Sequence, residues 1–88
     1  MTYRIEVKPS ALDALARIPQ PQRRRIAQKI DRLADNPRPR GARALEGRLS
    51  LYRIRIGDYR VVYQIQDAAL LVLVGRIGDR GDVYRHLP

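Results

Sequence analysis

The sequence predicts a small α+β domain, in which an antiparallel sheet carries two N-terminal helices packed on one face. Strand-like alternation occurs once before and three times after two stretches of helical periodicity, which gives the element order β-α-α-β-β-β. The chain has 88 residues, which is room for one core. We therefore expect residues 1–88 to form a single domain.

The first strand and the two helices are predicted from the N-terminal half. Residues 2 to 8 alternate between apolar and charged side chains, as a strand with one buried face does. Ser10 then heads the stretch SALD, which predicts a helix capped by Ser10 with Asp13 as the reaching carboxylate. The stretch IPQP ends that helix, and a second amphipathic helix is expected from Pro21 to about Asp35.

The C-terminal half is predicted to hold the other three strands. Residues 36–47 are dense in Pro, Gly and Arg, so we expect a surface loop without regular structure. Strands are expected at residues 49–56, 59–66 and 70–77. The last of them is apolar on both faces, which indicates either a central strand covered on both sides or a strand with helices on one face and a partner on the other.

The stretch YRIRIGDYRVVY indicates a β-hairpin. Gly57 and Asp58 form a two-residue turn, because glycine at the first central position accepts a positive φ. The turn sets a register in which one face is wholly apolar and aromatic, so this face should pack against the helices. The pairs on that face are Ile56 with Tyr59, Ile54 with Val61, and Tyr52 with Tyr63.

The other face of the hairpin gathers like charges. Arg55 should lie opposite Arg60, and Arg53 opposite Val62. Like charges directly opposite each other destabilise a sheet by up to about 1 kcal/mol. Three guanidinium groups on one solvent-facing patch therefore indicate an anion site, with a phosphodiester as the favoured anion. The alternative is that these arginines form ordinary solvated ion pairs with acidic residues elsewhere.

Composition points to an anionic partner. The chain has 18 basic and 9 acidic residues, a formal charge of +9, and all but two of the basic residues are arginine. Arginine grips phosphate bidentately and keeps its charge when partly buried. Nucleic acid or an acidic protein would suit this charge. There is no cysteine, and no apolar stretch approaches the ~20 residues of a membrane span, so we expect a soluble cytoplasmic protein with no membrane partner.

The C-terminal stretch VGRIGDRGDVYRHLP adds further basic residues and one aromatic ring. Tyr84 stands among Arg76, Arg80 and Arg85, as expected if its ring stacks on an unpaired base, although a packing role is the usual one for such a tyrosine. His86 is read as a tail residue. One histidine and scattered carboxylates do not supply the convergent ligands of a metal site, so no metal or cofactor is expected.

Taken together, YRIRIGDYRVVYQI, the long apolar strand, the terminal DRGDVYR and the leading YRIEV strand before two amphipathic helices resemble the RelE branch of the RelE/ParE toxin superfamily. The resemblance covers nearly the whole chain. It implies the toxin of a type II toxin–antitoxin pair. Toxins of the RelE type enter the ribosomal A site and cut the mRNA there without a metal, which inhibits translation.

The resemblance also implies site residues. Arg53, Arg55 and Arg60 match basic active-site positions, Arg80 matches another if a short gap is allowed, and Tyr84 matches an aromatic position. The best-known members have lysine where this chain has Arg53 and Arg55. A desolvated lysine can approach neutrality, but arginine cannot, so the general base stays open. Tyr84, His86, and a group on the ribosome or substrate are the candidates.

The resemblance further implies partners, and two rival functions remain. The partners are an acidic, partly disordered antitoxin, the 70S ribosome with mRNA, and operator DNA only through the antitoxin complex. A ParE-like toxin would have a similar fold but would inhibit DNA gyrase. A non-catalytic nucleic-acid-binding module would show salt-dependent binding without cleavage.

Overall fold

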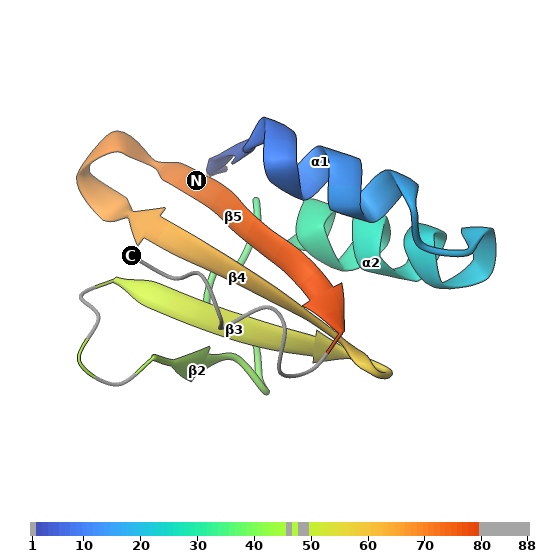
Figure 1. The fold of residues 1–88 in the computed structure, drawn as a ribbon. Coiled ribbons are helices and arrows are strands. Elements are labelled where there is room, and N and C mark those ends of the chain that lie inside the picture. Colours follow the sequence, from blue (N-terminus) through green and yellow to red (C-terminus); the bar gives the residue numbers. More distant parts are fainter. Residues whose placement is uncertain (1, 46, 48–49, 80–88) are drawn as a thin grey trace.

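The computed structural model describes residues 2–45, 47 and 50–79. Figure 1 shows a twisted sheet with two helices on one side. The elements in chain order are β1 (Arg4–Val7), α1 (Pro9–Ala16), α2 (Gln20–Arg32), β2 (Arg43–Ala44), β3 (Leu51–Ile56), β4 (Tyr59–Gln66), a short 3₁₀ turn η1 (Asp67–Ala69) and β5 (Leu71–Asp79). None of the helices in this part of the chain is long and apolar enough to cross a bilayer.

The α+β fold class is confirmed, but the sheet is mixed rather than purely antiparallel. Its strand order is β1-β5-β4-β3-β2, and β1 runs parallel to β5. Parallel neighbours need a crossover of a dozen residues or more. The two helices carry the chain from β1 across the sheet, and the β3-β4-β5 meander then brings it back beside β1 (Figure 1).

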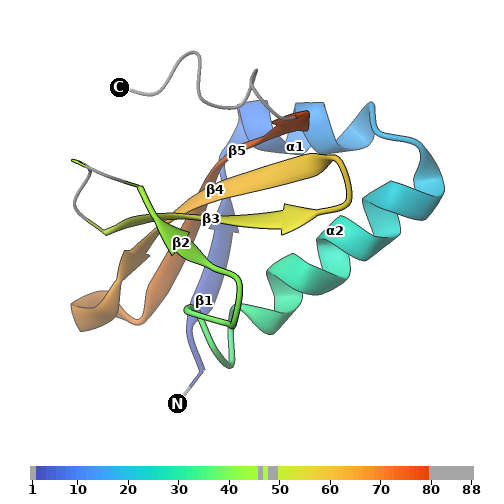
Figure 2. The ribbon, with the colours of Figure 1, turned by 90° about the horizontal axis from the view of Figure 1, so that it is seen from below.

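Both helices cover the same face of the sheet (Figures 1 and 2). α1 packs against β5, and α2 packs against β3. The core lies between these layers, and the expected apolar face of the hairpin contributes to it. Its most deeply buried side chains come from α2 and the central strands: Ile26, Val61, Tyr63, Ile65, Val72 and Val74.

The helix ends differ from the sequence prediction. α1 begins at Pro9, with Lys8 as the residue before it, and no side chain caps it, so the expected capping box at Ser10 is wrong. Proline suits the first helical position because its missing N–H would have no partner there. α2 begins at Gln20 and ends at Arg32, three residues before Asp35, as the chain turns to enter the connection to β2.

The connection expected to lack regular structure contains the short strand β2. Arg43 pairs with Arg53 and Ala44 with Tyr52, and the Leu45 N–H donates to the Leu51 carbonyl at 2.8 Å. The backbone N–H and C=O groups along the outer edge of β3 need hydrogen-bond partners. The two residues of β2 provide partners for some of these groups. Strand formation here depends on the neighbouring edge and leaves no periodic signal in the sequence.

The hairpin register is confirmed at every predicted pair. Gly57 has a φ of 60°, as the turn requires, and Ile56 lies opposite Tyr59. A shift in the β4–β5 pairing follows: Val62 pairs with Arg76, whereas Tyr63 pairs with Val74. Gly75 therefore has no pairing partner in β4, as in a β-bulge. The bulge places Arg76 on the face of the sheet that points away from the helices.

Candidate functional site

The candidate site is the face of the sheet that points away from the helices. In the β3–β4 pairing, Arg55 lies opposite Arg60 and Arg53 lies opposite Val62, as predicted. Directly opposed residues of an antiparallel pair share a face, so the three arginines lie on one side of the hairpin. Arg55 is exposed, and Arg53 and Arg60 are half-buried.

Two further arginines join this face from the neighbouring strands. Arg43 of β2 is directly opposite Arg53, and Arg76 of β5 is opposite Val62. We call the five residues Arg43, Arg53, Arg55, Arg60 and Arg76 the arginine face. The sequence did not predict that Arg43 lies on this face, because β2 was not expected. The abundance of arginine in the connection that contains Arg43 was the signal that could have indicated it.

The arginine face contains two direct like-charge pairs, Arg55 with Arg60 and Arg43 with Arg53. None of these four arginines forms an ion pair with a carboxylate in residues 2–45, 47 and 50–79. The reading that they serve as ordinary ion-pair partners therefore receives no support from this part of the chain. The arrangement suits a multiply charged anion, which would offset the repulsion.

Arg80 and Tyr84, the other two expected site residues, lie outside the described residues, as does His86. Their roles remain predictions from the sequence. In the part of the chain that the structure describes, no three histidine or carboxylate side chains gather into a possible metal site.

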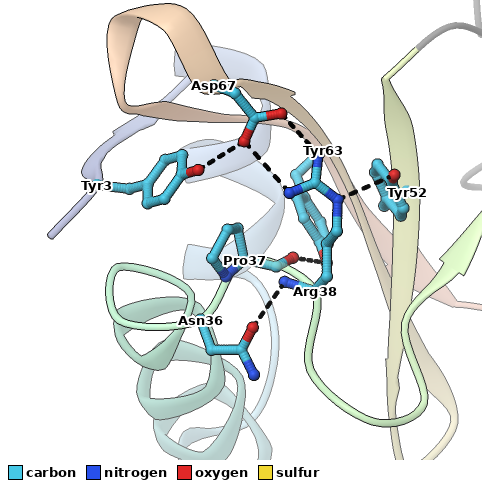
Figure 3. Close-up of polar contacts among 7 residues, drawn as sticks. All are labelled: Tyr3, Asn36, Pro37, Arg38, Tyr52, Tyr63 and Asp67. Atoms are coloured by element: carbon cyan, nitrogen blue, oxygen red, sulfur yellow. Dashed lines mark hydrogen bonds and ion pairs between the residues drawn. The ribbon is translucent and has the colours of Figure 1, made fainter. Parts of the chain in front are cut away.

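A second polar cluster lies at the other end of the hairpin, where β4 passes into η1 (Figure 3). Arg38 donates to both carboxylate oxygens of Asp67, at 3.2 and 2.7 Å. Its Nε donates to the Tyr52 hydroxyl at 3.1 Å, and its guanidinium lies 5.3 Å from the centre of the Tyr52 ring. The Tyr3 hydroxyl also donates to Asp67, at 2.5 Å. This cluster, which we call the Arg38 clamp, fastens the connection after α2 to the sheet.

The Arg38 clamp changes the ionisation of its members. Hydrogen bonds from Arg38 and then Tyr3 lower the pKa of Asp67 to about 2, and the same bonded carboxylate raises the pKa of Arg38. Beneath the clamp, Tyr63 stacks on Tyr52 and donates to the Pro37 carbonyl at 2.7 Å. Burial raises the pKa of Tyr63 to about 12. Both effects keep the groups in the charge states that their partners require.

Sequence comparison places the chain among known toxins. Residues 5–84 match the family described as "ParE toxin of type II toxin-antitoxin system, parDE". A putative RelE-like toxin protein of Escherichia coli is 30% identical over 88 residues, covering 96% of this chain and 92% of the relative. The putative toxin RelE1 of Methanocaldococcus jannaschii is 26% identical, covering 98% and 99%.

Structural comparison agrees. The archaeal RelE–RelB complex from Pyrococcus horikoshii matches with a TM-score of 0.82 and 34% identity over 92% of this chain and 98% of that one. A mutant of the E. coli toxin RelE in the free state matches with a TM-score of 0.81 and 26% identity over 96% and 92%. The chain therefore belongs to the RelE branch of the RelE/ParE toxin superfamily and is a toxin of the type II toxin–antitoxin class.

Proposed function

We propose that the protein is a ribosome-dependent endoribonuclease, which cuts mRNA in the ribosomal A site without a metal and so inhibits translation. The observation that carries this proposal is the opposition of Arg55 and Arg60 on the sheet face away from the helices, with Arg53 beside them and no described carboxylate paired to any of the three. The similarity to RelE toxins supports the same activity.

The chemistry explains what the arginines would do. The ribose 2′-oxygen attacks the adjacent phosphorus, the bond to the 5′-oxygen breaks, and negative charge builds on the phosphorane. We propose that Arg53, Arg55 and Arg60 stabilise that charge and that Arg80 adds a fourth guanidinium. A guanidinium stays protonated at pH 7, so these residues do not serve as the general base.

The proton transfers need other groups. Tyr84 is proposed to orient the nucleotide by stacking, and its hydroxyl is one candidate for proton transfer. His86 and a group on the ribosome or the substrate are the others. A chain with this acid–base equipment would depend on the ribosome to hold the RNA in line for attack, which accounts for the proposed need for a translated message.

A cognate antitoxin is the proposed protein partner. The P. horikoshii and E. coli relatives were solved as complexes of RelE with the antitoxin RelB. A formal charge of +9 suits an acidic, partly disordered antitoxin that orders on this surface. We propose that operator DNA is reached only through that complex, and that the toxin acts in the cytoplasm, where ribosomes are.

One observation favours a second candidate. The matching family is named for ParE, and a ParE-like toxin would inhibit DNA gyrase. That activity needs no cluster of arginines directed at a phosphate, which is why the nuclease is preferred. A supercoiling assay with gyrase would test the second candidate directly.

The experiment that tests the nuclease is cell-free translation. The purified protein is added to a translated message, and breaks are mapped by primer extension with and without ribosomes. Cuts that appear only on translated message, at the A-site codon, are the expected result. An intact message with normal translation would rule the proposal out.

A further inference from the structure

A basic groove lies between α2 and the edge of the sheet formed by β2 and β3. Its volume is about 430 Å³. Lys29 and Arg32 line it from α2, Arg40 and Arg43 from the connection and β2, and Arg53 and Arg55 from β3. The apolar side chains of Leu33 and Ile54, both buried, also line it.

The charge of the groove is one-sided. Six of its lining residues are basic and none is acidic. In the described part of the chain, none of the six forms an ion pair with a carboxylate. Lys29 and Arg32 stand in the last turn of α2, where cations also favour the helix dipole, but this effect accounts for only two of the six. The convergence of six cations around one hollow favours a bound polyanion.

The groove continues directly from the arginine face. Arg53 and Arg55 belong to both, since their positions in β3 place them on the face and their side chains also line the groove. β2 pairs with Tyr52 and Arg53, but no described strand pairs with the outer edge of β3 at Ile54, Arg55 or Ile56. The way from the face over this edge into the groove is therefore not blocked by a paired strand.

We propose that the groove binds phosphate groups of the RNA strand that flank the nucleotide held on the arginine face. The proposal rests on the proposed function, because the shared residues Arg53 and Arg55 are those assigned to the cleaved phosphate. RNA is favoured over an acidic protein segment because the groove is continuous with the arginine face. An RNA strand that is held for cleavage must extend beyond the arginine face, and the part of the β3 edge without a paired β-strand leads from this face into the groove. Guanidinium groups spaced along the path suit successive phosphates.

The test measures binding without ribosomes and without cleavage. A fluorescent 2′-O-methyl RNA of nine nucleotides, which lacks the attacking hydroxyl, is titrated with the full chain at several salt concentrations. The groove variant is Lys29→Ala with Arg32→Ala. The control variant is Arg24→Ala with Arg25→Ala, which removes the same charge from exposed positions of the same helix that do not line the groove.

The groove variant should bind the nine-nucleotide RNA about tenfold more weakly, and its slope of log affinity against log salt should be shallower by about 1.4, the value for two phosphate contacts. The control should stay within about threefold of the parent. A trinucleotide, which fills only the arginine face, should bind the parent and the groove variant equally.

Three results would overturn the proposal: no binding of RNA by the parent at low salt, equal losses in both variants, or RNA binding by the groove variant that matches the parent while its affinity for poly-glutamate falls. The last would make the groove a protein site. The translation assay remains a separate readout. If the groove variant loses RNA binding but the parent leaves the message uncut, the nuclease is refuted and the groove proposal stands. If the parent cuts the message but the groove variant binds RNA as well as the parent does, only the groove proposal is refuted.

Discussion

Arginine is used in opposite ways at the two ends of the hairpin. Arg38 has a carboxylate, a hydroxyl and an aromatic ring as partners, all from other segments of the chain. Arg55 and Arg60 instead face each other across β3 and β4, and neither is paired with a described carboxylate. The first arrangement stabilises the fold, and the second costs stability.

This contrast teaches how to separate structural from functional arginines in a chain that is rich in them. An arginine that stabilises the fold has partners that accept hydrogen bonds from its guanidinium group and balance its charge. Arg55 and Arg60, the residues proposed to bind a ligand, have no carboxylate partner among the described residues and repel each other. Substitutions at the two ends should therefore have opposite effects on stability and activity.

The largest effect is expected beneath the Arg38 clamp, at Tyr63. Its side chain is fully buried against Tyr52, and Tyr63→Ala should lower the free energy of unfolding by about 4 kcal/mol through the cavity it opens. Denaturant unfolding followed by circular dichroism measures this. Tyr63→Phe is the matched control, which keeps the ring and loses only the hydrogen bond to Pro37, at a cost of about 1 kcal/mol. An alanine variant as stable as the phenylalanine variant would contradict this placement of the ring.

On the arginine face, Arg60→Ala should reduce A-site cleavage by about 100-fold, the scale for loss of one group that stabilises a transition-state charge. Its stability should be unchanged or higher by a few tenths to about 1 kcal/mol, because the repulsion with Arg55 disappears. Primer extension and thermal unfolding provide the two readouts. Arg24→Ala, an exposed position on α2, is the control for the lost charge. Full activity in the Arg60 variant would remove this face from the mechanism.

The Arg38 clamp should respond in the opposite way. Arg38→Ala should keep cleavage within about threefold of the parent at low temperature but lower the melting temperature. Loss of the contact with the Tyr52 ring alone costs about 0.5 to 1 kcal/mol. Arg38→Lys, which keeps the charge and loses the fork to Asp67, should be intermediate. A variant with normal melting and lost cleavage would place Arg38 in the site instead.

The smallest effect is expected at Asp67 and depends on pH. Its pKa in the folded protein is about 2, below the ordinary 3.8, so the carboxylate adds stability above about pH 4 and loses this contribution as the pH falls through about 2. Between pH 4 and pH 2 the melting temperature of the parent should therefore fall further than that of Asp67→Asn. Parallel curves for the two proteins over this interval would show that the Arg38 clamp does not lower the pKa.

Local patterns predicted the hairpin and missed what distant segments decide. Alternation and the two-residue turn at Gly57 were enough to set every pair in β3 and β4, and with them the place of Arg53, Arg55 and Arg60. The parallel pairing of β1 and the strand at Arg43 depend on partners far along the chain. The bond between Arg38 and Asp67 spans 29 positions, and neither residue carries a local signal for it. Arg80 and Tyr84 remain predictions, because both lie outside the described residues.

The pairing of β1 with β5 determines when the protein can complete its fold during synthesis. The chain is synthesised from its N-terminus, so β1 leaves the ribosome before the other strands of the sheet. Its apolar side chains then have no neighbouring strand to pack beside. Its neighbour in the sheet is β5, which is made after the helices and the rest of the meander. The β1–β5 pairs cannot form before β5 has been synthesised. The core of this toxin is therefore completed only after nearly all residues of the domain have been made.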